Sequence, residues 1–100
     1  MKVVFHEDFY RVYTSDPAAE SGRMEAVVEV IGPHVRFETA QPCSEEDILA
    51  VHTENHMKQV RREGLHEIAS LAAGGAVMAA EIGLTEPCFG LIRPPGHHAS

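Results

Sequence analysis

Two adjacent histidines, His97 and His98, are the residues of this sequence best suited to chemistry. They follow an apolar run, residues 88–92, and a stiff Arg-Pro-Pro-Gly turn. In open parallel α/β sheets the functional crevice lies beyond the carboxyl ends of the strands, so a strand stopping here would bring both imidazoles to that crevice. Repulsion between neighbouring imidazolium charges favours a neutral ring, which can act as a base near pH 7. A tandem His is as typical of a tag remnant or a surface loop as it is of a catalytic site. Spacing alone does not decide between these two interpretations.

The elements that must position these histidines follow from the apolar pattern along the chain. Alternating strand and helix signals predict a parallel sheet with right-handed crossovers, and we expect one α/β unit over residues 1–100. The predicted strands are residues 2–6, covered on both faces, an edge strand at 35–38, and a buried strand at 88–92. The predicted helices are residues 20–31, a helix starting at the Ser44 cap, 55–63 and 65–82.

Gly74 and Gly75 lie inside the longest predicted helix. Each costs the helix about 1 kcal/mol relative to Ala. A helix carries such a pair where it packs against a sheet too closely for side chains. This pair therefore predicts that helix 65–82 lies directly on the sheet, and it is no phosphate-binding loop because the P-loop Lys is absent.

Composition narrows the classes of partner. The 100 residues are 44% hydrophobic and 23% charged, which is typical of a folded domain rather than a disordered one. A net charge of −7 argues against nucleic-acid and anionic-membrane partners, because both require a basic surface. Only three of the 15 acidic residues are Asp: Asp8, Asp16 and Asp47. Chemistry that depends on Asp therefore has few candidates.

The two cysteines and the apolar runs indicate a compartment. Cys43 and Cys88 are far apart and form no CxxC motif, which favours free thiols in a reducing, cytoplasmic setting. Neither cysteine has an evident catalytic triad. The apolar start, residues 3–5, is too short for a signal peptide. The longest apolar stretch, residues 71–80, falls short of the ~20 residues of a membrane span.

Residues 89–99, Phe-Gly-Leu-Ile-Arg-Pro-Pro-Gly-His-His-Ala, resemble the R-P-P-G-H-H-A signature of the histone deacetylase superfamily. That group includes bacterial acetylpolyamine amidohydrolases and acetoin-utilisation-type deacetylases. Three weaker segments match the family in the same order: residues 20–24, which resemble its early P-x-R segment, residues 48–54 with their Val-His pair, and residues 72–80 with the A-A-G-G helix. The resemblance covers nearly the whole chain.

The resemblance implies a fold, a reaction and a set of roles. The fold would be the N-terminal part of a three-layer, parallel-sheet arginase/deacetylase-like domain. In that family a zinc-bound water attacks the amide of an acetyllysine or acetylpolyamine, releasing acetate and a free amine. Carried over, His98 would be the general base and acid, and His97 would stabilise the developing charge. Arg23 and Gly96 would line the channel or substrate pocket.

Two departures from the family pattern limit what this chain could do alone. The family's zinc ligands include an Asp-x-His motif downstream of the tandem His, and no such motif occurs in these 100 residues. We therefore expect no metal ligand here, zinc only in the complete enzyme, and no activity from the isolated chain. The stretch between His52 and Leu71 is also much shorter than in most members. It offers no match for the family's substrate-gripping Asp, which leaves the substrate class open.

Two other classes of function stay open besides the enzyme and its acetylated amine substrate. The chain could be an assembly module, because a bare strand edge at residues 88–92 would favour a homo-oligomer or pairing with a C-terminal half. It could also be a small metal-binding protein that uses His97, His98 and another subunit's His. A further His pair, His52 and His56, has the i, i+4 spacing of a helical zinc pair, although a packed or solvated helix is the favoured interpretation.

Overall fold

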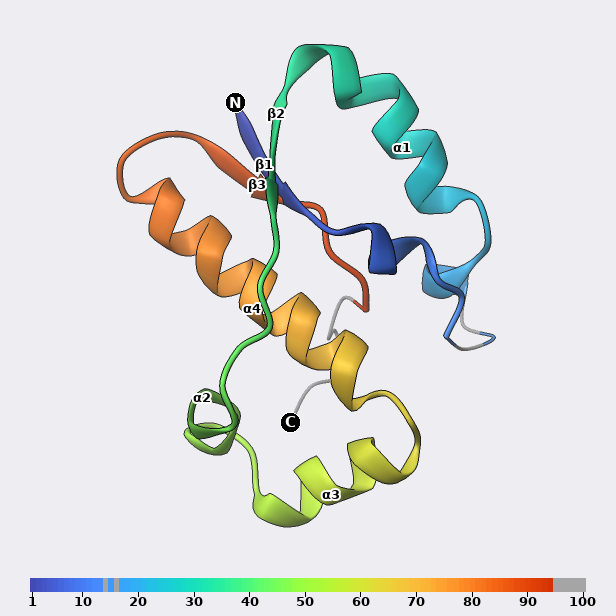
Figure 1. Ribbon diagram of the computed structural model, residues 1–100, viewed down its shortest axis with the longest axis vertical. Coiled ribbons are helices and arrows are strands. Elements are labelled where there is room, and N and C mark those ends of the chain that lie inside the picture. Colours follow the sequence, from blue (N-terminus) through green and yellow to red (C-terminus); the bar gives the residue numbers. More distant parts are fainter. Residues whose placement is uncertain (14, 16, 95–100) are drawn as a thin grey trace.

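A three-stranded parallel sheet forms the centre of the molecule in a computed structural model, which describes residues 1–13, 15 and 17–94 (Figure 1). The strand order is β2 (Arg36–Thr39), β1 (Lys2–Phe5), β3 (Cys88–Gly90). Both outer strands pair parallel with β1, and Val3 is in register with Phe37 on one side and Phe89 on the other. The predicted α/β class and parallel sheet are confirmed.

The helices connect the strands in the predicted order. They are the 3-10 helices η1 (Glu7–Tyr10), η2 (Pro17–Ala19) and η3 (Gly32–His34) and the α-helices α1 (Arg23–Ile31), α2 (Glu45–Leu49), α3 (Glu54–Arg62) and α4 (His66–Gly83). The first α-helix starts at Arg23 rather than at residue 20. Its N-cap is Gly22, whose φ of +87° lies in the left-handed region that favours glycine, so the chain turns there before the helix begins.

Side-chain caps explain where the two short helices start. The Ser44 hydroxyl accepts a hydrogen bond from the Asp47 backbone N–H at 3.1 Å, which confirms the predicted start of α2. The Thr53 hydroxyl accepts one from the His56 N–H, also at 3.1 Å, and so caps α3. The chain leaves α3 through Gly64, where φ is +75°. The Thr53 cap marks the boundary between α2 and α3, and Gly64 marks the boundary between α3 and α4.

The core lies on both faces of the central strand. Val3 and Val4 point to opposite faces, and both are completely buried, as predicted for a strand covered on two sides. α4 packs against β1 and β3 on the face of Val4. On the other face Phe5 forms ring contacts with Phe9, Tyr10 and Phe37.

The glycine pair of α4 brings the helix into direct contact with the sheet and with the loop after β2. A Cβ on Gly75 would lie 2.9 Å from Ile92 Cγ2 and 3.3 Å from Ala40 Cβ. A Cβ on Gly74 would overlap the Gln41 carbonyl oxygen and lie 2.7 Å from the Cys43 nitrogen. The predicted close approach is therefore confirmed, and it positions the segment that follows β3.

β3 differs from its prediction as a buried strand over residues 88–92. The strand is shorter, Cys88–Gly90, and its middle residue, Phe89, is 55% exposed. The reason is that β3 is an edge of the described sheet, so only β1 lies beside it. The chain nevertheless stays close to β1, because the Leu91 N–H donates to the Val4 carbonyl at 2.9 Å and Leu91 is buried.

β2 lies at the opposite edge, which confirms the predicted edge strand, and Phe37 is 40% exposed there. Among the residues that the structure describes, no helix is both long enough and apolar enough to cross a membrane.

Candidate functional site

The carboxyl ends of the three strands define the edge at which a parallel α/β sheet carries its site. β1 ends at Phe5 and continues into His6, and β3 ends at Gly90 and continues through Ile92 to Arg93. The strand that leads toward the tandem histidines therefore stops at the predicted edge. Gly96, His97 and His98 themselves lie outside the described residues, and their roles stay predictions.

Arg93 is the best-defined polar residue at this edge. Its side chain is buried, with 2% of the residue exposed. Nη1 donates to the Glu20 carbonyl at 2.9 Å, and Nη2 donates to the carbonyls of Tyr10 at 3.0 Å and Arg11 at 3.3 Å. Its Nε is buried and has no acceptor among the described residues. The guanidinium thus joins the end of β3 to two points of the N-terminal segment.

Arg93 is not among the predicted site residues, although a signal for it was present. An arginine placed directly after an apolar strand run is costly to bury unless its donors are satisfied. Such a residue is therefore expected to find acceptors in a distant segment. Which segment supplies them depends on the tertiary fold and cannot be derived from spacing.

Arg23 lies at the start of α1 with an exposed side chain. Its Nη1 donates to the Pro17 carbonyl at 2.9 Å. Arg23 and Arg93 therefore hold carbonyls of the same short stretch, at Pro17 and Glu20 respectively. The structure brings the two segments together, and the predicted channel role of Arg23 stays a prediction.

His6 occupies the end of the central strand and is a second residue outside the predicted set. Its Nδ1 accepts a hydrogen bond from the Asp8 N–H at 3.0 Å and lies 3.7 Å from Asp8 Oδ2. In the shorter contact Nδ1 is the acceptor, and the ring caps the start of η1. His6 lines an open hollow of about 420 Å³ whose other walls are Asp8, Pro42, Cys43, His66, Glu67, Ser70 and Leu71.

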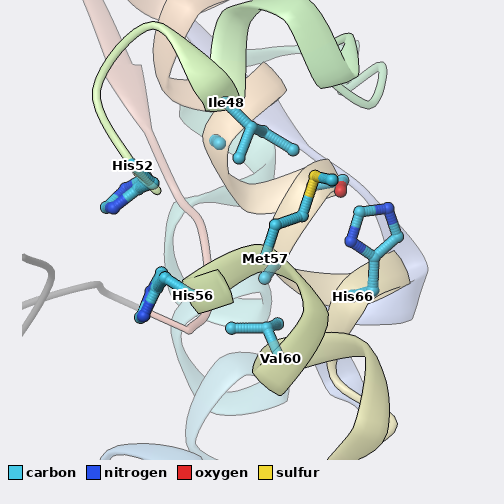
Figure 2. Close-up of a pocket in the computed structure, with 9 residues that line it drawn as sticks. Ile48, His52, His56, Met57, Val60 and His66 are labelled. Atoms are coloured by element: carbon cyan, nitrogen blue, oxygen red, sulfur yellow. The ribbon is translucent and has the colours of Figure 1, made fainter. Parts of the chain in front are cut away.

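A smaller, largely apolar pocket of about 120 Å³ lies between α2, α3 and α4 (Figure 2). His52 and His56 stand at its rim with their rings stacked, the centroids 4.9 Å apart and the planes at 27°. A metal ion binds the lone pair of an imidazole nitrogen, which lies in the ring plane, and stacked rings direct these lone pairs side by side rather than at one point. The geometry favours packing over a zinc pair.

The side chains that could bind a metal ion do not form a cluster among the described residues. Within residues 1–13, 15 and 17–94, no three His, Cys, Asp or Glu side chains lie close enough together to hold a metal ion. The residues described at the sheet edge therefore do not fit the zinc that the family resemblance implies.

Comparison with known proteins shows which family the sequence belongs to. The chain is 32% identical to a probable deacetylase from Archaeoglobus fulgidus, over 97% of this chain and 34% of that protein. It is 31% identical to a probable deacetylase from Methanothermobacter thermautotrophicus, over 98% of this chain and 36% of that protein. A histone deacetylase-like amidohydrolase from Pseudomonas aeruginosa is 30% identical over 76% of this chain and 26% of its own length. This chain belongs to the histone deacetylase superfamily. No family model matches the sequence.

Coverage shows how much of a deacetylase the chain corresponds to. The chain spans about a third of the length of the two archaeal deacetylases, which fits the N-terminal part of the domain. The alignment with the Archaeoglobus protein runs over 131 positions, whereas the chain has 100 residues. That deacetylase therefore carries residues with no counterpart here, which agrees with a shortened stretch within the chain.

The two thiols of this deacetylase-family chain are free. Cys43 borders the hollow beside His6, and its backbone N–H donates to the Ser70 carbonyl at 2.9 Å. Burial, and to a smaller extent the charge of Asp47, raises the pKa of the Cys43 thiol above its ordinary value. The thiol is therefore protonated at neutral pH, which favours a structural role over nucleophilic catalysis.

Proposed function

We propose that this chain is the N-terminal portion of a zinc-dependent amidohydrolase that removes acetyl groups from acetyllysine or acetylpolyamine-type substrates. One observation carries the proposal. In a chain homologous to deacetylases, β3 ends at the carboxyl edge of the sheet and leads through the buried Arg93 toward His97 and His98. This is the position where parallel α/β proteins carry catalytic residues.

The reaction requires a base and an acid on the same face of the amide. Water adds its oxygen to the acetyl carbon, and the bond from that carbon to nitrogen then breaks. His98 accepts the proton from the attacking water and delivers it to the leaving amine nitrogen, so acetate and a free amine are the products. His97 stabilises the negative charge that develops on the carbonyl oxygen.

The proposed zinc dependence rests on the resemblance to the family and not on residues of this chain. The 100 residues contain no Asp-x-His motif, and the described residues form no metal-binding group. We therefore assign no step to a metal held by this chain. The isolated 100-residue polypeptide is expected to be inactive, since its metal ligands would come from outside it.

Two free thiols fit a reducing compartment, and we place the reaction in the cytoplasm on that basis.

A chimeric enzyme tests the proposal. These 100 residues replace the matching segment of the Archaeoglobus fulgidus probable deacetylase, and the product is assayed with an acetyllysine peptide and with an acetylated polyamine. We expect hydrolysis of at least one of the two, no hydrolysis by the isolated chain, and a loss of at least 10²-fold for His98→Ala. His34→Ala, at an exposed histidine of η3, is the matched control and should leave the rate unchanged.

An inactive chimera that is folded and loaded with zinc would contradict the proposal. Zinc-dependent turnover by the isolated chain would contradict the part that places the metal ligands elsewhere.

The exposed edge of β3 supports a second candidate function, that of an assembly module. β3 pairs with β1 alone among the described strands, and Phe89 is 55% exposed beside it. Unpaired strand edges recruit further strands, so we propose a second copy or a separately encoded C-terminal half as the partner.

A further inference from the structure

We propose that Arg93 is a positioning residue that fixes the N-terminal segment against the end of β3. The two anchor points are the carbonyls of residues 10–11 and the carbonyl of Glu20. The meaning of this arrangement for catalysis rests on the proposed function. The contacts themselves do not.

The contacts join parts of the chain that are remote in sequence. The three hydrogen bonds connect residues 73, 82 and 83 positions apart. All three acceptors are backbone carbonyls. No ion pair of Arg93 occurs among the described residues. The guanidinium is therefore held by its donor geometry rather than by a counter-charge.

That geometry requires arginine. Nη1 reaches Glu20 while Nη2 reaches residues 10–11, so two nitrogens of one planar group bind two separate stretches. A lysine ammonium is a single point charge at the end of a flexible stem and cannot reproduce the fork. Arg93→Lys should therefore keep the charge and lose the double anchoring.

The position of the anchor relates it to the predicted site. Arg93 lies four residues before His97, and Glu20 lies three residues before Arg23. The guanidinium thus links the strand end that leads to the tandem His with the stretch that leads to the predicted channel arginine. Small displacements of catalytic groups lower rates steeply, by about 10²-fold for 1 Å, so such a link would matter for turnover.

Hydrogen exchange on the full 100-residue chain tests the anchoring without any activity. The amides of Arg11, Glu20 and Arg23 are reporters, because each donates a backbone hydrogen bond beside an anchor point. In Arg93→Gln and Arg93→Lys we expect exchange at these amides to accelerate at least tenfold. The exchange rates of amides in α4, such as that of Ala69, should change less than twofold. The control is Arg62→Gln, at an exposed position of α3, in which the exchange rates of all amides should change less than twofold.

Changes below twofold at the three reporter amides would overturn the proposal. Equal acceleration at the reporters and in α4 would also overturn it, since Arg93 would then contribute only to global stability.

The chimeric deacetylase provides the second readout. Arg93→Lys should lower kcat at least tenfold and change KM less than threefold, because the group is proposed to place catalytic residues rather than to bind substrate. An active chimera with normal kcat in Arg93→Lys would overturn the positioning role. If the unsubstituted chimera is inactive, the proposed function fails, and the exchange experiment alone decides the role of Arg93.

Discussion

Gly75 of α4 lies so close to Ile92, two residues beyond β3, that a Cβ on the glycine would be 2.9 Å from Ile92 Cγ2. The backbone of α4 therefore packs directly on the segment that leads to Arg93 and the tandem histidines. Because Gly75 carries no side chain, the Ile92 side chain packs against the helix backbone, and this contact helps to set the position of the segment. The absence of a side chain at Gly75 is thus a structural requirement of the candidate site.

Gly74→Ala should destabilise the protein more than Gly75→Ala. The new Cβ of Gly74→Ala would meet the backbone of residues 41–43, which cannot rotate away, whereas that of Gly75→Ala would meet side-chain atoms. Overpacking of this kind costs about 1–3 kcal/mol. Gly83→Ala is the control in the same helix, because nothing lies within 4 Å of its Cβ position. Urea unfolding of the three variants measures the difference, and equal stabilities would contradict the close approach of α4.

Alkaline pH should lower the stability of the fold through Cys43. Its thiol pKa is raised in the folded chain by burial and by Asp47, so the unfolded chain loses its proton first as the pH increases. The protonated thiol makes its full contribution to the free energy of unfolding below the ordinary pKa of 9.0. This contribution is lost as the pH rises through the higher pKa of the folded chain. Unfolding free energies measured between pH 8 and 11 for the wild type and for Cys43→Ser should differ in slope. Parallel curves would show that Cys43 has no raised pKa.

Self-association should occur through β3. Multi-angle light scattering of the isolated chain is expected to show a dimer or larger species at high concentration, because the strand edge and Phe89 are exposed. Phe89→Glu should shift the species toward the monomer. Val30→Glu is the control, since Val30 is 72% exposed but lies on α1. A clean monomer at high concentration would argue against the assembly module.

Zinc should not remain on the isolated chain. After incubation with zinc and dialysis, elemental analysis is expected to find less than one tenth of an equivalent, because a stable site needs three or four protein ligands. Three metal-binding side chains do not come together within the described ranges, residues 1–13, 15 and 17–94. A stoichiometric metal would favour the small metal-binding protein that uses His97 and His98.

Local signals in the sequence were sufficient for most elements. The Ser44 hydroxyl caps α2 in the structure because its acceptor reaches an amide only three residues away, at Asp47. The buried central strand was predictable because Val3 and Val4 are apolar on both faces. The tandem His and its surrounding motif indicated the deacetylase family, and the homologues bear this out.

Long-range contacts decided the rest. Gly74 and Gly75 predicted a close approach of their helix to the sheet. Only the fold shows that Gly74 meets the backbone after β2 and that Gly75 meets Ile92. The exposure of Phe89 depends on which strands lie beside β3, which no residue near it encodes. The anchoring of Arg93 on Tyr10 and Glu20 is of the same kind, because hydrogen bonds across more than 70 residues exist only after the sheet has brought the segments together. Sequence determined most elements and predicted which residues follow the strand end, and tertiary structure decided what holds that strand end in place.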